Sequence, residues 1–376
     1  MVYLDFAATG LLYTEVLDAM REAELSYIGN PSSLHKAGYA AKRALDNARE
    51  KILSLLGVGS SHNLIFTSCA TESNNAFLKG VAFRYQNRGK KILTSSAEHP
   101  SVINALKALV PFGFEVVELP LGENGYVEPK TLRDAMDSSV ALVSIIGVNN
   151  ETGAISPLKE YSSIIKTFPK AIFHSDLTQA IGKLHLDFSC LDAFSFSAHK
   201  FGGPAGVGGL VMKKSLSPLP LLDGGAQENG LRAGTSNVVG AIAMAMALEL
   251  SYADMKANTK KIEDLQAKLK QGLLALGEDD WNSPPGASPF VFNFSLKHHK
   301  ASVFVEALSN LDIYVSSVSA CSSKKEPVSH VLLAMGKTNE QAGNSIRVSL
   351  GYQSEESDID ALLDALERLL KEVHPR

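Results

Sequence analysis

Apolar residues along the chain recur in two ways: in short runs, which predict strands, and at helical spacing, which predicts helices. The two kinds of stretch alternate. A helix is expected at 35–56, where apolar residues recur on one face and Gly57 ends the pattern. A second helix is expected at 72–83. Short apolar runs predict strands at 64–66, 91–94, 114–119, 140–146, 171–173 and 193–197. This alternation favours a mainly parallel sheet covered by helices, the α/β class.

The pattern changes in the second half of the chain. A glycine-punctuated loop is expected at 224–235, followed by a long helical region at 236–276. Beyond residue 289 the order is typical of an α+β unit, with strands at 290–294 and 313–315 and helices at 301–308 and 355–373. We therefore expect a large domain at 15–255 and a smaller one made of 1–14 plus 256–376.

Composition excludes some partner classes. Lys+Arg 36 against Asp+Glu 40 gives a net charge of −4, so bulk charge favours neither nucleic acid nor an anionic membrane. The N-terminus lacks a secretion-signal pattern, and the longest apolar stretch, 238–250, is shorter than the roughly 18 residues of a membrane span. Cys69, Cys190 and Cys321 are odd in number and far apart, which predicts no disulfide framework, no metal site and a reducing cytoplasm.

Lys200 lies at the end of the predicted strand 193–197, just before a glycine-rich run. Aromatic neighbours would desolvate its amine and lower its pKa, as a Schiff-base lysine requires. Ser197 and His199 could donate hydrogen bonds to an anion beside it. The alternative is a lysine whose stem packs at a strand end while its charge reaches water.

Other polar residues also follow predicted strands, where ligands of α/β sheets gather. Thr71 stands in a run of small residues that opens a helix, so it suits either a phosphate or a plain capping box. His99 is a flat ring at a strand end, and 149–153 is either a ligand loop or a turn.

Asp176 ends the strand that begins at 171, with Gln179 three residues later. A carboxylate at the end of an apolar strand is costly without a partner. A lysine that binds pyridoxal phosphate works with such an acid, because a carboxylate on the ring nitrogen keeps the pyridinium protonated. Asp176 followed by one strand and Lys200 therefore favours a pyridoxal enzyme.

Two residues of the C-terminal part could act on a substrate. Cys321 lies in a polar segment near Lys324 and Lys325, which would favour its thiolate, unless it is an incidental surface cysteine. Arg347 lies on an alternating strand, where its guanidinium could bind a substrate carboxylate or form a surface ion pair.

Short motifs now align along nearly the whole chain with one family. They are YLDFAAT (3–9), GNPSS (29–33), ATE (70–72), EH (98–99), VNNETG (148–153), DLTQ (176–179), SFSAHK (195–200), GLRAGT (230–235), SACS (319–322), SHVL (329–332) and IRVSLG (346–351). The chain resembles the cysteine desulfurases of the class V aminotransferase group. The resemblance implies the aspartate-aminotransferase-like fold, pyridoxal phosphate fold type I, with a seven-stranded, mainly parallel sheet and a smaller α+β domain.

The resemblance also implies a role for each matching residue. Lys200 would hold the cofactor, Asp176 would pair with its pyridinium, His99 would stack on the ring, and Gln179 would bond the phenolic oxygen. The phosphate would be bound by Thr71, Ser197 and His199, with Thr235 coming from the second subunit of a homodimer. Asn150 and Arg347 would hold the carboxylate of L-cysteine.

In the implied reaction Lys200 removes the α-proton and the Cys321 thiolate attacks the substrate sulfur. The products are L-alanine and a persulfide on Cys321, whose sulfur passes to an acceptor such as an iron-sulfur scaffold or a thiolation protein. A class V aminotransferase, a selenocysteine lyase and a degenerate assembly partner are the alternatives. Three positions depart from the family pattern, namely Val318, Gln227 and Gly10.

Overall fold

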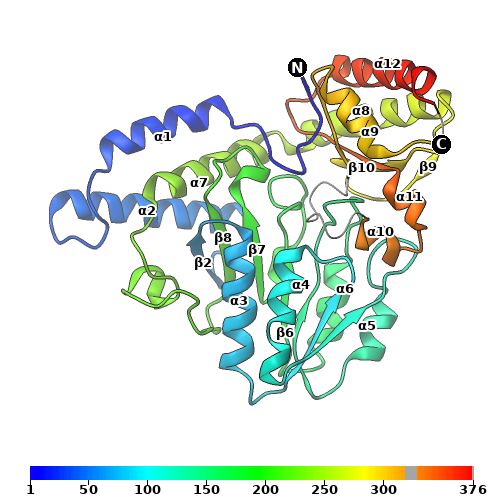
Figure 1. Cartoon of the computed structure of the whole chain (residues 1–376). Coiled ribbons are helices and arrows are strands. Elements are labelled where there is room, and N and C mark those ends of the chain that lie inside the picture. Colours follow the sequence, from blue (N-terminus) through cyan, green and yellow to red (C-terminus); the bar gives the residue numbers. More distant parts are fainter. Residues whose placement is uncertain (318–327, 375–376) are drawn as a thin grey trace.

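The computed structural model describes residues 1–317 and 328–374. Its centre is a seven-stranded sheet with the order β2-β8-β7-β6-β5-β3-β4 (Figure 1). Every neighbouring pair is parallel except the two pairs that β8 makes with β2 and β7. The strands are β2 (His62–Thr67), β3 (Lys91–Ser95), β4 (Glu115–Leu119), β5 (Val140–Ser144), β6 (Ile172–Asp176), β7 (Ala193–Ser197) and β8 (Gly208–Lys213). The prediction of a mainly parallel sheet is confirmed.

Helices cover both faces of this sheet because its strands carry apolar side chains on both sides. One face packs against α3 (Ala70–Arg84) and α4 (Pro100–Lys107), through residues such as Phe77 and Leu106. The other face packs against α2, α6 and α7. These three helices are α2 (Lys36–Leu55), α6 (Leu158–Ile165) and α7 (Val238–Ala253), and the same part of the chain also contains α1 (Thr14–Ser26) and α5 (Pro129–Ala135).

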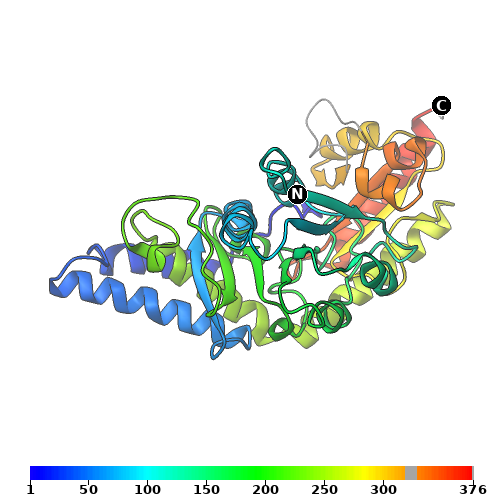
Figure 2. The same cartoon turned by 90° about the horizontal axis from the view of Figure 1, so that it is seen from below.

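A second, antiparallel sheet has the order β12-β13-β10-β9. Its strands are β9 (Asp280–Trp281), β10 (Val291–Ser295), β12 (Ser316–Ser317) and β13 (Ser345–Ser349). Three helices contribute to its separate hydrophobic core, and two short helices lie beside it (Figure 2). These are α8 (Met255–Ala275), α9 (Ala301–Ser309), α10 (His330–Ala334), α11 (Asn339–Gly343) and α12 (Glu356–Glu372).

The chain start belongs to this second unit. Strand β1 (Val2–Tyr3) pairs in parallel with β11 (Ile313–Tyr314), and Leu4 lies in the core of the second unit. From there the chain crosses to the large sheet before α1 begins (Figure 1). The first ten residues therefore run across the junction of the two sheets.

The expected helical region at 236–276 is two helices rather than one. Helices α7 and α8 meet at Asp254 with a bend of 70°. Within the described ranges no single helix is long and apolar enough to cross a membrane, although this bent pair passes that test when its helices are taken together. The expected loop at 224–235 is irregular, and its turn Gln227–Gly230 contains two left-handed residues, Glu228 and Asn229.

Candidate active site

The carboxyl ends of β6 and β7 meet the first residues of the chain, and Lys200 lies at this meeting point. It ends the 3₁₀ turn Ala198–Lys200 that follows β7 directly. Its Nζ donates hydrogen bonds to the carbonyl oxygens of Ala7 at 2.8 Å and Ala8 at 2.6 Å. The lysine expected at the end of this strand thus points at two backbone carbonyl oxygens of the N-terminal segment.

The N-terminal segment 5–10 also fixes the residue before Lys200. The amide of Gly10 donates to His199 O at 2.7 Å, and Thr9 Oγ1 lies 3.1 Å from His199 Nδ1. Burial, together with the charges of Lys200 and Lys183, lowers the pKa of His199 to about 4. His199 is therefore neutral at physiological pH and can act as a hydrogen-bond donor to an anion.

Asp176 lies at the end of β6 and is only 4% exposed. Its carboxylate accepts hydrogen bonds from Asn74 Nδ2 at 2.7 Å and from the Thr178 amide at 3.0 Å. A carboxylate offers about four lone-pair sites, so the group retains capacity for a third donor. Such an arrangement suits a pyridinium N–H.

Asn74 connects Asp176 with His99. Besides Asp176, its Nδ2 donates to Ser101 Oγ at 2.9 Å, and Ser101 Oγ lies 2.8 Å from His99 Nδ1. The Ser101 amide also donates to that nitrogen, at 3.1 Å. Because Nδ1 accepts, the neutral ring carries its proton on Nε2.

His99 caps the N-terminus of α4 and remains partly exposed. Desolvation by the surrounding protein lowers the pKa of His99, and the nearby Lys200 charge lowers it further, while Asp176 acts in the opposite direction. The structure therefore brings His99, Asp176 and Lys200 into one electrostatic environment, as their sequence positions predicted.

The start of α3 forms the other side of the site. Ser197 Oγ accepts the Ala70 amide hydrogen at 2.7 Å, and Thr71 is the exposed second residue of the helix. Amides of a first helical turn lack intrahelical acceptors and attract anions. Gly208 of β8 makes this approach possible, since a Cβ there would lie 2.6 Å from the backbone of Cys69.

Arg347, on β13, is 3% exposed. Its Nη2 pairs with Asp5 Oδ1 at 2.7 Å, and its Nη1 donates to Asn150 O at 3.1 Å. Its Nε finds no acceptor among the described residues. Arg347 thus forms an ion pair, as one alternative from the sequence predicted, but the pair is buried between the two units and is not at the surface.

Cys321 lies outside the described residues, as does Val318, but the residues on both sides of that segment contact the site. Ser316 of β12 is the register partner of Arg347. On the other side, His330 Nε2 lies 3.2 Å from Glu98 O, next to His99. The described residues that precede and follow this segment, Ser316 and His330, therefore both lie at the site.

Thr235 is exposed in this chain. Its loop is fixed by Arg232, whose Nε donates to Glu72 Oε1 at 2.8 Å, near the start of α3. Glu228 of the same loop is buried and pairs with Arg49 at 2.7 Å.

Several site residues were not singled out from the sequence. Asp5 and Asn74 bond Arg347 and Asp176 from other segments. His174 interacts electrostatically with Asp176 on the same strand, and Lys183 bonds Gln179 four residues before it. His174 is fully buried between Ser144 Oγ and Ser195 Oγ and stacks on Phe77. Asp5 stands in the YLDFAAT motif, which was the available signal.

Comparison with known proteins shows which family has this arrangement. The family described as aminotransferase class-V matches residues 2–362. A protein named cysteine desulfurase IscS from Dictyoglomus turgidum is 39% identical over 99% of this chain and 95% of its own length. Another of that name, from Methanosarcina thermophila, is 37% identical over 99% and 92%. A solved structure titled NifS-like protein has a TM-score of 0.92 and 37% identity, covering 99% of this chain and all of that one.

The chain therefore belongs to the class-V aminotransferases. Within them it belongs to the cysteine desulfurases, which are enzymes dependent on pyridoxal phosphate and have fold type I. The donor set fits this cofactor. A lysine amine, a buried carboxylate with spare capacity and a helix start beside Ser197 offer partners for its aldehyde, ring nitrogen and phosphate.

Proposed function

We propose that the chain converts L-cysteine to L-alanine and transfers the sulfur to Cys321 as a persulfide. The observation that carries the proposal is the convergence of Lys200, Asp176 and His99 in a chain related to cysteine desulfurases over nearly its full length. As the Cys321 thiolate forms an S–S bond to the substrate sulfur, the substrate's Cβ–S bond breaks. Its electron pair stays with the carbon skeleton, which takes up a proton to become alanine, so the reaction needs no external oxidant or reductant.

The cofactor would be held by the residues already expected. Lys200 would carry it, Asp176 would face its ring nitrogen, His99 would lie against its ring, and Gln179 would donate to its phenolic oxygen. Thr71, Ser197 and His199 would bind its phosphate, together with Thr235 of a second copy. When bound, pyridoxal phosphate supplies an electron sink for the bonds of the substrate's α-carbon.

Arg347 and Asn150 would hold the substrate carboxylate. The contact between Arg347 and Asn150 O, and the unpartnered Nε among the described residues, support this role. Asp5 fixes one side of the guanidinium, which leaves its other edge for the ligand. Lys200, released from the cofactor, would then take the α-proton.

Chain connectivity supports Cys321 as the sulfur acceptor. Ser317 ends β12 opposite Ile346, the residue before Arg347, and the four residues from Ser317 to Cys321 span at most about 14 Å. By contrast, Cys190 is buried, and burial raises the pKa of its thiol, which disfavours a nucleophilic thiolate. One solved relative, 28% identical over 93% of this chain with a TM-score of 0.80, is titled SspA in complex with cysteine.

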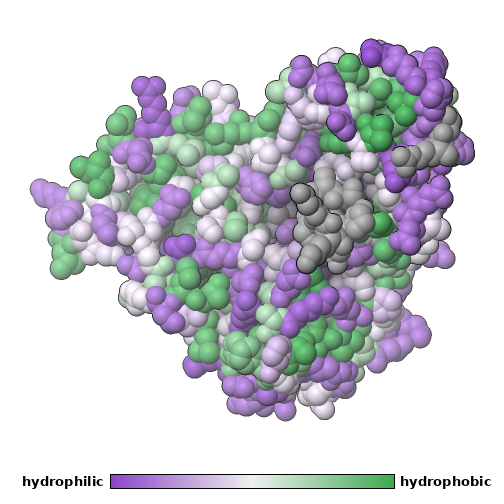
Figure 3. All heavy atoms as spheres, in the orientation of Figure 1, coloured by the Kyte–Doolittle hydropathy of each residue, from purple (hydrophilic) through white to green (hydrophobic). Residues whose placement is uncertain are grey.

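A homodimer is proposed from the exposed apolar side chains of α1, α2 and their connection. Figure 3 shows hydrophobic side chains gathered over this part of the molecule. The large apolar and aromatic residues of this stretch that are more than half exposed are Leu17, Leu25, Ile28, Leu34 and Tyr39. Contiguous exposed apolar surface of this kind marks an interaction site.

The persulfide sulfur would pass to an acceptor protein, either an iron-sulfur scaffold or a thiolation protein. We place the enzyme in a reducing cytoplasm, because Cys69 and Cys190 are free thiols and a persulfide needs an environment in which thiols persist.

The test compares the native protein with Cys321→Ser under reducing conditions. We expect the native protein to release sulfide and alanine in equal amounts from L-cysteine, and Cys321→Ser to retain the yellow cofactor while losing at least ~100-fold of the activity. Cys190→Ser is the matched control and should stay active. Activity retained in Cys321→Ser, or sulfide without alanine, would contradict the proposal.

A further inference from the structure

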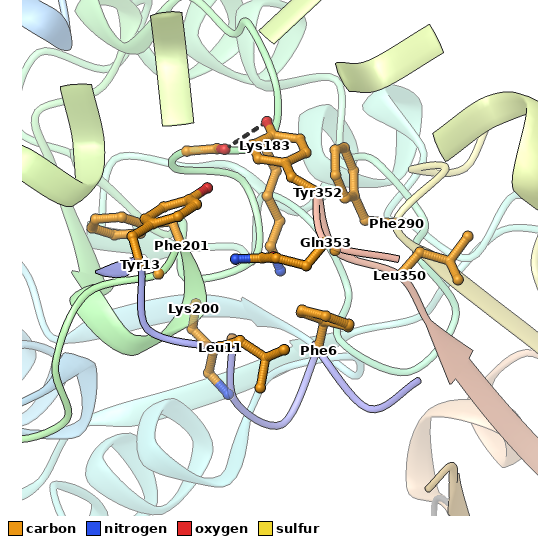
Figure 4. A pocket seen from close by; sticks show the side chains of 14 residues that line it. Phe6, Leu11, Tyr13, Lys183, Lys200, Phe201, Phe290, Leu350, Tyr352 and Gln353 are labelled. Atoms are coloured by element: carbon orange, nitrogen blue, oxygen red, sulfur yellow. Dashed lines mark hydrogen bonds between the residues drawn. The ribbon is translucent and has the colours of Figure 1, made fainter. Parts of the chain in front are cut away.

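Lys183 is a buried lysine that none of the roles above uses. It lies on the helical turn 177–184 after Asp176, and only 5% of its surface is exposed. Aromatic side chains surround it in a cavity of about 20 Å³, which Lys200 also lines (Figure 4). A lysine in such surroundings is costly unless its amine has a partner.

The partner of Lys183 is Gln179. Lys183 Nζ donates to Gln179 Oε1 at 2.8 Å, and Gln179 Nε2 donates to Ala7 O at 2.8 Å. Ala7 O is also the acceptor for Lys200 Nζ. The four groups therefore form a continuous line from Lys183 to Lys200.

Both neighbours require the same orientation of the Gln179 carboxamide. Ala7 O can only accept, so it requires the amide nitrogen. An ammonium can only donate, so Lys183 requires the amide oxygen. The carboxamide is thus held with its N–H groups on the side of Lys200 and its oxygen turned away.

The charges around Lys183 are consistent with this arrangement. Burial, together with the charges of Lys200 and Arg347, lowers the pKa of Lys183 to about 7. Tyr13 and Tyr352 are the other titratable groups of the cavity lining, and burial raises the pKa of both. An amine donates in either protonation state, so Gln179 keeps its partner across physiological pH.

We propose that Lys183 is a positioning residue that holds Gln179 so that an N–H, and never its carbonyl oxygen, faces the phenolic oxygen of the cofactor. The inference rests on the role of Gln179 in the proposed function. A donor at that oxygen stabilises its negative charge, which is least compensated when the lysine–cofactor linkage has lost its proton. Lys183 therefore favours the deprotonated linkage.

The experiment is a pH titration of the cofactor's absorbance in the loaded protein without substrate. Lys183→Met should raise the midpoint by about one pH unit and weaken cofactor binding by about tenfold, the effect of one hydrogen bond to a charged group. Lys183→Arg retains the donors and should stay within about a third of that shift. Lys159→Met, an exposed lysine, is the matched control and should not change the midpoint.

A double-mutant cycle separates positioning from a general charge effect. If Lys183 acts through Gln179, Lys183→Met adds no shift in a Gln179→Ala background. An equal shift in both backgrounds, or no shift in Lys183→Met, overturns the inference. The titration uses no substrate, so a failure of desulfuration would contradict the proposed function and leave this result standing.

Discussion

Asp5 shows how a single buried contact prepares a binding residue. It pairs with one side of the Arg347 guanidinium at 2.7 Å, on an arginine that is 3% exposed. A buried charge of this kind needs its partner, because desolvation would otherwise destabilise the folded protein. The pair also fixes the plane of the guanidinium fork.

We expect Asp5→Asn to raise KM for L-cysteine about tenfold, about 1.4 kcal/mol of binding, with a smaller effect on kcat. The reason is that Asn keeps an acceptor but not the charge that orients Arg347. Steady-state kinetics would measure this, with Asp264→Asn, which breaks an exposed pair on α8, as the control. An unchanged or lower KM would mean that Asp5 competes with the substrate instead.

The position of a site residue could be predicted from the sequence where that residue directly follows a predicted strand. Lys200 and Asp176 follow apolar strands, so their positions at the sheet edge could be inferred. Asn74 could not, because it depends on Ser101 and Asp176 from other segments. Lys183 could not, because its spacing of four residues from Gln179 does not show that its side chain is buried rather than turned to solvent. Gly10, one of the positions that depart from the family pattern, lies close to the backbone of His199. A Cβ at residue 10 would lie 3.1 Å from His199 O.

At the scale of elements, strand β8 was the main omission. Its first residues, Gly208 and Gly209, continue a glycine-rich run that is typical of a loop, yet they pair with β2 and β7. Strand β6 extends past its apolar residues through His174 and Asp176, which are buried by partners rather than by hydrophobicity. Contacts with other segments therefore determine both where β8 begins and where β6 ends.

Gly208 of β8 lies against the backbone of Cys69, the residue that precedes α3, so Gly208→Ala should disturb the start of that helix. The added Cβ would lie 2.6 Å from the Cys69 backbone, which must therefore move. We expect the dissociation constant for pyridoxal phosphate to rise at least ~10-fold, measured by reconstituting the cofactor-free protein. Gly343→Ala, where a Cβ meets nothing within 4 Å, is the control. Equal affinities would show that the α3 start does not bind the phosphate.

At the scale of the whole molecule, α1 and α2 project from the large unit and carry apolar side chains that this chain does not cover (Figures 1 and 3). We expect the protein to sediment at twice its 40.2 kDa chain mass. Ile28→Asp with Leu34→Asp should shift it to the monomer, because both side chains are over 80% exposed and would otherwise be buried.

Leu274→Asp, at an exposed leucine of α8, should remain dimeric in the same sedimentation experiment. The monomeric variant should also bind pyridoxal phosphate more weakly if Thr235 of the second copy reaches the phosphate. A native protein that sediments as a monomer would contradict both expectations.

The crossing of segment 5–10 between the two sheets has a consequence for biosynthesis. Asp5 and Ala7 find their partners Arg347 and Ser349 342 residues later in the chain. A ribosome releases these partners more than 300 residues after segment 5–10, so a nascent chain can complete its large sheet long before it can bind substrate. Catalytic competence is then acquired in a later step, when these two distant segments meet.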